Sequence, residues 1–476
     1  MPNAAPRFHI EEIRFAERDV VLRLPFRFGA ATVTSCPQVY VRARIRFADG
    51  RTREGCAAEM MIPKWFDKNP ALSNEDNFAQ LRQALSTTRD AYTAPAPANT
   101  AWGHFASHYV DGLDAGQRAG RNPLVSSYGP ALIDRAVLDA LCLDAGLGFG
   151  AAMSSDLCGV DPNHHGLAPD LAGFDMGAFL RAQRPRHRIA ARHTVGLADA
   201  IRDADWTAPA PHDGLPSSLE AVVARYGHRH FKLKLSGDDA GDLARLARIA
   251  EVIDPVAECV TLDGNEQYAD AAAFAHFLDA LFAEPALRTL VAKTAFIEQP
   301  IQRATALALD MRHIASRMPM LVDESDSTLD SFGAAQALGY TGVSSKSCKG
   351  FYKSVINAAR CAQGHARGGS ALFLSGEDLT MQAGIGVQQD LALVAWLGLA
   401  HVERNGHHYV NGMAALPAEE QSAFLARHAP LYEHSDGATR LRIVRGELDL
   451  SSLHAPGFAT GVEGSDIQWD AMRTNW

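Results

Sequence analysis

The chain has 476 residues, more than one ordinary hydrophobic core accommodates, so we expect two domains or one large barrel with additions. The formal net charge of −10 argues against a nucleic acid or an anionic membrane surface as partner. A content of 47% hydrophobic and 21% charged residues is typical of a folded, soluble protein.

The seven cysteines are dispersed and include no Cys-x-x-Cys pair. This pattern indicates reduced thiols of a cytoplasmic protein rather than a disulfide framework or a zinc cluster. The N-terminal sequence MPNAAPRFHIEEIRF lacks the apolar stretch of a signal peptide. The longest apolar run, from Leu391 to Ala400, is shorter than the roughly 20 residues of a membrane helix, and it predicts a buried helix.

The N-terminal part of the chain predicts strands followed by helices. Residues 8–62 alternate in polarity as antiparallel strands do, with turns expected at Gly29–Pro37 and Asp49–Gly50. Helical spacing covers residues 74–90 and 130–146, and Gly146 is suited to end the second helix.

From residue 188 onward, short β-like runs alternate with helical stretches rich in Ala and Leu. The runs begin at residues 188, 230, 259, 294, 319, 342 and 371, with a less regular eighth at 401. About eight such units predict a parallel barrel. The predicted organisation is an α+β capping domain over 1–150, a loop-rich connection over 151–187, a modified TIM-like (β/α) barrel over 188–410, and a C-terminal segment over 411–476 that packs back on the cap.

Carboxylates stand at the ends of three successive runs: Asp263, Glu298 and Asp323. The carboxyl ends of parallel barrel strands form one face, so these side chains are expected to converge. Converging carboxylates repel one another and resist ionisation unless a cation joins them. Oxygen ligands suit Mg²⁺, and Asn265 is positioned to add a polar contact.

Lysines flank this carboxylate series. Lys232 and Lys234, in HFKLKLSGDD, share one face of a predicted strand, and Lys346 ends the run after Asp323. A lysine near a metal and a second lysine is expected to have a lowered pKa, which would allow it to act as a general base.

Taken in order, the segments KLK, LDGN, IEQP, VDES and SSK resemble the enolase superfamily, in particular its muconate-lactonizing-type branch with two acid/base lysines. The first hairpin and the helix ending at Gly146 resemble that family's capping domain. By this resemblance Asp263, Glu298 and Asp323 are Mg²⁺ ligands, Lys234 and Lys346 are the acid/base pair, and Lys232 tunes Lys234. The mandelate-racemase branch fits less well, because the seventh run lacks its histidine.

The resemblance implies removal of the proton α to a carboxylate through a metal-stabilised enediolate. Two lysines on opposite faces allow racemisation or epimerisation of a small carboxylic acid. The same groups also serve a lyase, either an acid-sugar dehydratase or a cycloisomerase, and a non-catalytic metal-binding barrel is a competing interpretation. Members of this family commonly associate, so a homo-oligomer is expected.

Neighbouring residues leave alternatives open. Lys349 competes with Lys346 as the second lysine, and Glu324 is adjacent to Asp323, which is chosen on the resemblance. Glu377 is a candidate to touch the substrate or a lysine, although a helix-capping role is favoured.

Further candidates for substrate contact come from the first barrel run and from the cap. Arg192 and His193 either bind substrate or form a polar pair in the barrel wall. The cap loop 26–36, with Phe28, and the segment 59–68, with Lys64, Trp65 and Phe66, are expected to lie over the barrel mouth. The pairs His164–His165 and His407–His408 lack an acidic partner at metal-ligand spacing and are interpreted as polar loop groups.

Overall fold

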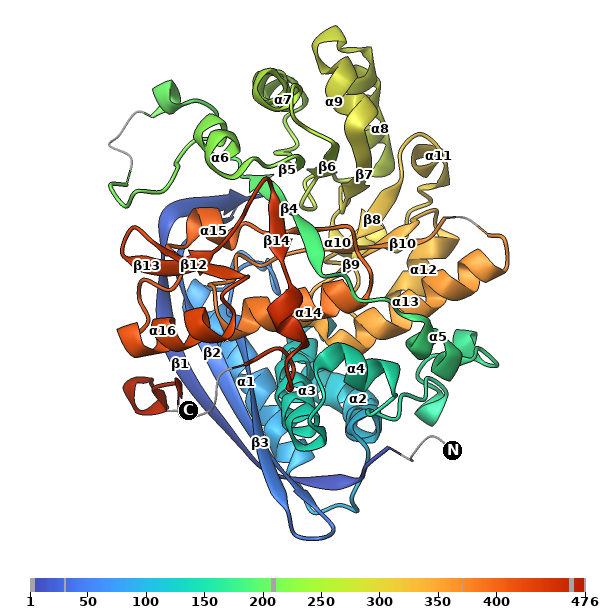
Figure 1. The fold of residues 1–476 in the computed structure, drawn as a ribbon. Helices are drawn as coiled ribbons and strands as arrows, with labels where there is room; N and C mark the ends of the chain where they lie inside the picture. Colours follow the sequence, from blue (N-terminus) through green and yellow to red (C-terminus); the bar gives the residue numbers. More distant parts are fainter. Residues whose placement is uncertain (1–4, 30, 207–210, 370, 462–465, 475–476) are drawn as a thin grey trace.

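The computed structural model describes residues 5–29, 31–206, 211–369, 371–461 and 466–474. Figure 1 shows a cap at the bottom, formed by the blue strands and the helices beside them, and a barrel above it. The eight barrel strands are parallel and the ring is closed, while the cap sheet is antiparallel. The predicted fold class, a capping domain plus a barrel, is therefore confirmed.

The cap sheet has the strand order β1–β2–β3. Its strands are β1 (Phe8–Phe28), β2 (Ala31–Phe47) and β3 (Thr52–Met60). The predicted turn over Gly29–Pro37 is wrong in extent, because β2 begins at Ala31 and pairs with β1 from that point on. Within the predicted loop 26–36, Ala30 lies outside the described residues.

Helices α1 (Asn74–Tyr92), α2 (Ala101–Arg118) and α3 (Pro123–Ala145) complete the cap. Asn122 accepts a hydrogen bond from the Val125 N–H and so caps the start of α3, which ends at Gly146 in the left-handed conformation. Gly146 therefore ends this helix as predicted. Helix α2 was not predicted.

The barrel strands lie in the order β4 to β11, and β11 pairs with β4 to close the ring. They are β4 (Arg188–Val195), β5 (His230–Lys234), β6 (Cys259–Asp263), β7 (Thr294–Glu298), β8 (Met320–Val322), β9 (Gly342–Ser345), β10 (Phe373–Gly376) and β11 (His401–Glu403).

Helices follow the barrel strands along the chain. They are α6 (Leu219–Tyr226), α7 (Asp239–Ile253), α8 (Ala271–Ala283), α9 (Arg288–Lys293), α10 (Arg303–Ala306), α11 (Arg312–Ala315), α12 (Ser331–Ala337), α13 (Phe351–Ala366), α14 (Ile385–Trp396) and α15 (Gly406–Tyr409). Every residue of α14 is buried, which agrees with the buried helix predicted around Leu391. Among the described residues, no helix is both long and apolar enough to cross a membrane.

Cap and barrel are joined through α4 (Phe149–Ser154) and α5 (Met176–Ala182). The chain ends in α16 (Ala418–Arg427), β12 (Tyr432–Ser435), β13 (Ala438–Leu441) and β14 (Glu447–Asp449). β14 pairs antiparallel with the first half of β4.

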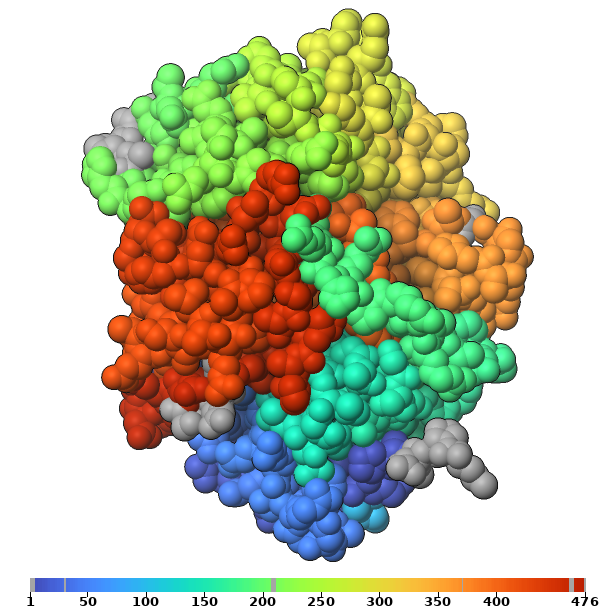
Figure 2. All heavy atoms as spheres, in the orientation of Figure 1, coloured from blue at the N-terminus to red at the C-terminus, as the bar shows by residue number. Residues whose placement is uncertain are grey.

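The last described residues return to the cap sheet. The backbones of Glu17 and Arg473 exchange two hydrogen bonds, of 2.9 and 3.0 Å. Trp469 lies edge-on to Tyr40, with the ring centroids 6.2 Å apart. In Figure 2 the red C-terminal segment covers the face of the molecule between the barrel and the cap.

Candidate active site

The two lysines of β5 share one face of their strand, as their i, i+2 spacing predicts. Lys232 and Lys234 are both buried, with exposed fractions of 1% and 7%. The alternate residues Phe231 and Leu233 belong to the hydrophobic cluster that includes Leu246 of α7. The lysines therefore face the barrel interior while their neighbours pack against a barrel helix.

Lys232 is surrounded by four carboxylates from four other strands or strand ends. Its Nζ lies 3.0 Å from Asp263 Oδ2, 2.6 Å from Glu298 Oε2, 2.8 Å from Glu377 Oε2 and 3.0 Å from Glu403 Oε2. A single buried ammonium would be costly to desolvate, but here it offsets the mutual repulsion of the acids around it.

Lys234 and Lys346 stand on opposite sides of the barrel mouth. β5 and β9 are four strands apart in the ring of eight, and Lys346 directly follows β9. Lys234 Nζ lies 2.6 Å from Asp263 Oδ2, and Lys346 Nζ lies 2.6 Å from Asp323 Oδ2. Each lysine thus pairs with a different predicted metal ligand.

These carboxylates change the pKa values of two of the site lysines. Burial opposes the charge of Lys232, but Asp263, Glu298 and two further acids outweigh it and raise its pKa well above the ordinary value. Burial likewise opposes the charge of Lys346, and Asp323 overcomes it, so that the pKa of Lys346 is raised. Both pKa values are raised because lysine–carboxylate attraction exceeds lysine–lysine repulsion. The expected lowering concerns a lysine beside a bound metal ion, and it stays a prediction.

Glu298 lies between the other two predicted metal ligands and shows why a cation suits this position. Burial, followed by the charges of Asp263 and Glu377, raises its pKa well above the ordinary value, and Asp323 adds to the effect. Its Oε1 is buried without a hydrogen-bond partner. A divalent ion would relieve both the repulsion and the orphaned oxygen, and an oxygen-only donor set fits Mg²⁺.

Glu324 is next to Asp323 and also buried, but it contacts a different group. Asn265 Nδ2 donates to Glu324 Oε1 over 3.3 Å, and Lys68 Nζ lies 3.9 Å from the same oxygen. Burial raises the pKa of Glu324. Asn265 itself has a φ of 40° and donates its backbone N–H to Asp263 Oδ1. Asn265 therefore links Asp263 to Glu324 at the rim of the site.

Lys349 is buried and contacts mainly groups other than those that line the cavity. Its Nζ lies 2.8 Å from Asp326 Oδ2 and 2.6 Å from Ser344 Oγ, and it is 3.5 Å from Asp323 Oδ1. Lys346 lines the cavity at the barrel mouth and Lys349 does not. This geometry favours Lys346 over Lys349 as the lysine that meets a substrate.

Arg192 and Glu377 form a pair inside the barrel. The Arg192 guanidinium contacts the Glu377 carboxylate and donates to the Gly376 carbonyl over 3.1 Å, and neither side chain is exposed. Glu377 therefore touches Lys232, as one prediction held, and it does not cap the following helix, whose N-cap position is Gly384. For Arg192 the arrangement agrees with a barrel-interior pair rather than with a substrate contact.

His193 points to the other face of β4 and is buried there. Its ring lies 5.3, 5.4 and 5.1 Å from those of His228, His407 and His408. The interpretation of His407 and His408 as polar loop groups is wrong, because both are buried, with exposed fractions of 8% and 2%.

The cap supplies an apolar wall over the lysines. Phe26, Phe28, Ile62 and Trp65 line a cavity of about 20 Å³ together with the three site lysines. The Lys346 ammonium lies 4.4 Å from the centroid of the Trp65 ring. A cavity of this size holds about one water molecule, so the cap closes tightly over the barrel mouth.

Lys64 and Phe66 point elsewhere. The Lys64 ammonium donates to the backbone carbonyls of Asn69 and Leu72, and Phe66 packs against Tyr128 with centroids 5.1 Å apart. Neither residue lines the cavity, so their predicted role in substrate contact is not supported by their placement.

Arg303 fastens this cap segment to the barrel. It donates to the carbonyl oxygens of Trp65 and Phe66 over 2.8 and 3.1 Å. The same guanidinium is paired with Glu266 over 2.8 Å, and Lys68 also contacts Glu266. The sequence pattern predicted none of these clamp residues.

The end of the eighth strand supplies residues that sequence reasoning missed. Glu403 accepts from Lys232 and from Thr194, over 3.0 and 2.5 Å, and Asn405 lines the cavity. The usable signal was an acid at the end of the eighth β-like run, where the other runs also carry charge.

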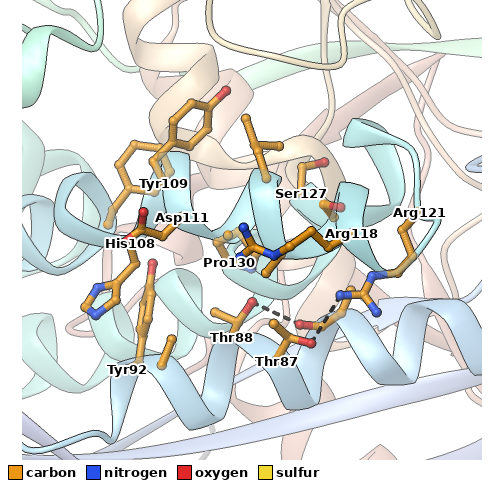
Figure 3. A pocket seen from close by; sticks show the side chains of 17 residues that line it. Thr87, Thr88, Tyr92, His108, Tyr109, Asp111, Arg118, Arg121, Ser127 and Pro130 are labelled. Atoms are coloured by element: carbon orange, nitrogen blue, oxygen red, sulfur yellow. Dashed lines mark hydrogen bonds between the residues drawn. The ribbon is translucent and has the colours of Figure 1, made fainter.

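A second cavity, of about 360 Å³, lies between α1, α2 and α3 in the cap. Figure 3 shows its lining, with Arg121 donating to Thr87 across one side. None of the predicted lysines or carboxylates lines it. It is therefore separate from the candidate active site.

Fold and site together define an eight-stranded barrel under an antiparallel cap, with lysines and carboxylates at the carboxyl ends of its strands. A family model described as enolase C-terminal domain-like matches residues 215–460, more than half of the chain. The chain belongs to the enolase superfamily and is an enzyme of the racemase, epimerase or lyase type. A comparison with curated proteins finds no match.

Solved structures with similar folds include three named enzymes. The 2-chloromuconate cycloisomerase from Rhodococcus opacus 1CP is 18% identical, with a TM-score of 0.60, and the match covers 98% of this chain and 100% of that one. The muconate lactonizing enzyme from Pseudomonas fluorescens is 19% identical, with the same score and coverage. The dipeptide epimerase from Enterococcus faecalis V583 is 12% identical, with a TM-score of 0.60 over 95% and 99% of the two chains. At these identities the likeness establishes the fold alone.

Proposed function

We propose that the protein removes the proton α to the carboxylate of a small molecule with the help of Mg²⁺, and that it racemises or epimerises its substrate. The observation that carries this proposal is the placement of Lys234 and Lys346, which line one cavity from strands on opposite sides of the barrel. A substrate carbon between them would be open to proton transfer on either face.

Asp263, Glu298 and Asp323 would hold the Mg²⁺. When bound, the ion would polarise the substrate carboxylate and stabilise the negative charge that develops when the α-proton leaves. Lys234 would take the proton at its Nζ, and Lys346 would deliver one at its own Nζ from the opposite face. Lys232 would hold the inner carboxylates in place through its four ion pairs.

The substrate is expected to carry an apolar group beside its carboxylate. The cap wall contributes Phe26, Phe28, Ile62 and Trp65 to the cavity, whereas charged groups come from the barrel. The cavity of about 20 Å³ is too small for such a molecule, so the cap loops would have to open for substrate entry. We further propose that the protein is cytoplasmic and acts as a homo-oligomer. Light scattering on the purified protein would test the oligomeric state.

A lyase of the muconate-lactonizing type is the second candidate, and one observation favours it. The Lys346 ammonium lies 2.6 Å from Asp323 Oδ2 and 4.4 Å from the centroid of the Trp65 ring. A lysine held in its charged form would serve as an acid or as a fixed cation rather than as a base. The reaction would then use Lys234 alone for proton removal, as in a dehydration or a cycloisomerisation.

Exchange of the α-proton with solvent separates these candidates. A library of amino-acid derivatives, dipeptides and sugar acids is incubated with the enzyme and Mg²⁺ in D₂O, and loss of the α-proton signal is followed by NMR. A racemase should exchange both enantiomers, and Lys234→Ala and Lys346→Ala should each abolish exchange of one of them. The matched control is Lys293→Ala, at the end of α9. Full exchange in both site variants would refute the two-base mechanism.

A further inference from the structure

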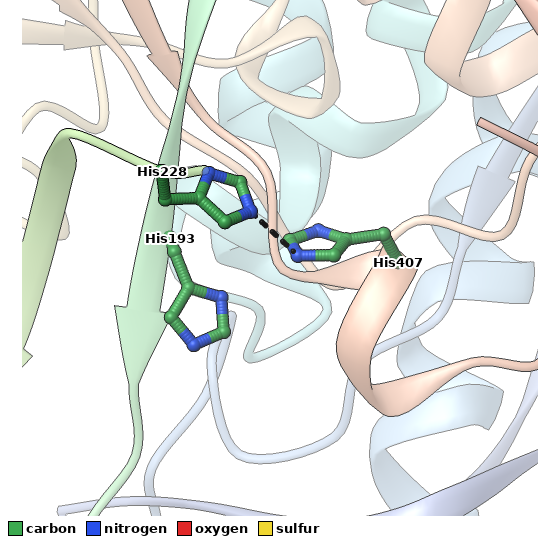
Figure 4. Close-up of side chains that lie close together, drawn as sticks. All are labelled: His193, His228 and His407. Atoms are coloured by element: carbon green, nitrogen blue, oxygen red, sulfur yellow. Dashed lines mark hydrogen bonds between the residues drawn. The ribbon is translucent and has the colours of Figure 1, made fainter. Parts of the chain in front are cut away.

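Three buried histidines meet on the outside of the barrel, away from the lysines. His193 lies on β4, His228 lies two residues before the start of β5, and His407 lies in α15 (Figure 4). Their exposed fractions are 1%, 0% and 8%. One ring nitrogen from each of the three lies within 4.8 Å of the others. Figure 4 shows the three rings gathered around one small space.

The hydrogen bonds of His228 fix which of its nitrogens faces the other rings. Its Nδ1 lies 2.9 Å from the Ala191 carbonyl oxygen, which can only accept, so Nδ1 carries the hydrogen. In the neutral ring, Nε2 then offers a lone pair, and it points at His407 Nε2 over 3.2 Å. Metal-binding histidines are commonly held in this way, with the distant ring nitrogen donating to a backbone carbonyl.

The third ring has an unused nitrogen in the same buried region. His193 Nδ1 is buried and makes no hydrogen bond. A buried nitrogen without a partner is costly, and a metal ion would satisfy it. Two nitrogens that share a tetrahedral zinc ion at bonds of about 2.0–2.1 Å are about 3.3–3.4 Å apart. The separation of 3.2 Å between His228 and His407 is close to that spacing.

Burial keeps the three rings neutral. Burial lowers the pKa of His193 and of His407 well below the ordinary value, and it lowers that of His228 to about 4. Asp199 lies 3.9 Å from Nε2 of the adjacent His408, and Arg23 donates to the His408 carbonyl. Neutral imidazole is the form that ligates a metal.

We propose that His193, His228 and His407 bind one divalent transition-metal ion such as Zn²⁺. An imidazole-only donor set suits zinc, copper, nickel or cobalt, whereas Mg²⁺ requires oxygen ligands. This site is therefore chemically distinct from the carboxylate site at the barrel mouth. A cavity of about 10 Å³ borders His407 and Tyr226 but neither of the other two histidines, and a space of that size holds about one water molecule. A tetrahedral ion would take a water molecule as its fourth ligand.

The position of the cluster indicates a structural role for the ion. β4 and β11 are the first and last strands of the ring, and their pairing, through three residue pairs, closes the barrel. His193 comes from β4, and His407 follows β11 by a few residues. An ion held by both histidines would join the two sides of this seam. Through His228 it would also hold the segment that leads into β5.

Cobalt provides the test, because Co²⁺ replaces zinc and reports its own geometry. The full-length protein is stripped with a chelator and titrated with Co²⁺ in excess Mg²⁺, so that the carboxylate site is occupied. One equivalent should produce the intense visible absorption of tetrahedral Co²⁺, and one equivalent of Zn²⁺ should displace it and raise the melting temperature. Weak octahedral absorption, or no retained metal, in the wild-type protein would overturn the proposal.

Variants then locate the ion. His407→Gln should raise the dissociation constant for Co²⁺ at least about 100-fold and remove the stabilisation by Zn²⁺, since one of three ligands is lost. The matched control is His165→Gln, whose side chain is exposed and should leave both readouts unchanged. If His407→Gln binds Co²⁺ like the wild type, the proposed site is wrong. The wild-type titration decides the question by itself if the variant does not fold.

Discussion

The ammonium of Lys346 lies 4.4 Å from the centroid of the Trp65 ring, so a barrel lysine and a cap indole form one contact. On its other side the same ammonium is 2.6 Å from Asp323 Oδ2. The cap therefore contributes directly to the environment of a proposed acid/base group. Opening of the cap would remove this contact and would expose Lys346.

Replacement of Trp65 should weaken substrate binding. Trp65→Leu removes a cation–π interaction of about 0.5–2 kcal/mol and part of the apolar wall. We expect KM to rise about 10-fold, with a smaller change in kcat. A 10-fold change corresponds to about 1.4 kcal/mol of binding free energy. Steady-state kinetics on the substrate identified by the exchange screen measures this. Trp469→Leu is the control, because Trp469 likewise has a cation over its ring, that of Arg42, but lies outside the cavity. An unchanged KM in Trp65→Leu would contradict the expectation.

Replacement of Arg303 should loosen the cap segment that contains Trp65 and Phe66. Arg303→Met removes two hydrogen bonds to the carbonyls of Trp65 and Phe66 and an ion pair with Glu266. We expect a loss of about 2–3 kcal/mol in the free energy of unfolding. Amide hydrogen exchange of the 61–68 segment should become faster. Arg312→Met, which breaks only an exposed pair with Asp310, should change neither.

Replacement of Lys346 and replacement of Lys349 should produce different defects. Lys346→Met should retain the fold and lose α-proton exchange of one enantiomer by at least about 10³-fold, within the range of general acid–base effects. Lys349→Met should chiefly lower stability, by about 1–3 kcal/mol, because it removes one of the two buried lysines that contact Asp326 and leaves Lys353. Exchange per folded molecule, measured beside urea unfolding, distinguishes them. The reverse pattern would make Lys349 the acid/base group.

His104 in the cap should make stability fall in mild acid. Its Nε2 lies 2.9 Å from the Phe8 carbonyl oxygen, and burial lowers its pKa to about 4. Between pH 6.5 and 4 the unfolded chain binds the proton and the folded chain does not, so stability falls as the pH falls. This one group contributes up to about 1.4 kcal/mol per pH unit, and none above pH 6.5.

His104→Gln should therefore flatten the acid side of the stability curve measured by urea unfolding between pH 4 and pH 8. His165→Gln, at an exposed position, should keep the wild-type slope. A slope that is the same in all three proteins would show that His104 takes up its proton in the folded state as readily as in the unfolded state.

Glu298 should destabilise the protein when no metal is bound, and it should be required for stabilisation of the protein by Mg²⁺. Its raised pKa shows that the ionised form is disfavoured next to Asp263 and Glu377. Glu298→Gln should therefore melt at the same temperature as the chelated wild type or above it, yet gain nothing from Mg²⁺. Glu251→Gln, which changes an exposed ion pair with Arg202, should respond to Mg²⁺ like the wild type. A Mg²⁺-dependent rise in Glu298→Gln would remove Glu298 from the proposed ligand set.

The barrel could be predicted because its strands repeat a simple pattern, an apolar run that ends in charge. That pattern placed Asp263, Glu298 and Asp323 at the ends of β6, β7 and β8, and alternation placed Lys232 and Lys234 on one face. These features depend on local spacing along a strand. Their roles as ligands and bases remain predictions.

The parts that could not be predicted depend on packing between distant segments. The raised pKa of Lys232 comes from carboxylates of several strands, which no spacing along the chain displays. The histidine cluster draws on residues 193, 228 and 407, which barrel closure brings together. The hold of Arg303 on the cap likewise spans more than 200 residues of sequence.

The backbone bridge between Glu17 and Arg473 also bears on the order in which the protein is built. The two residues are 456 positions apart, so β1 leaves the ribosome long before its partner is synthesised. At roughly 5–20 residues per second, that interval lasts about 20–90 s. β1 is an edge strand of its sheet, and exposed edges invite pairing with other chains. The three strands of the cap sheet are encoded first, but the bridge on the edge of β1 forms only after translation is almost finished. Chaperone protection of that edge would matter most during the interval.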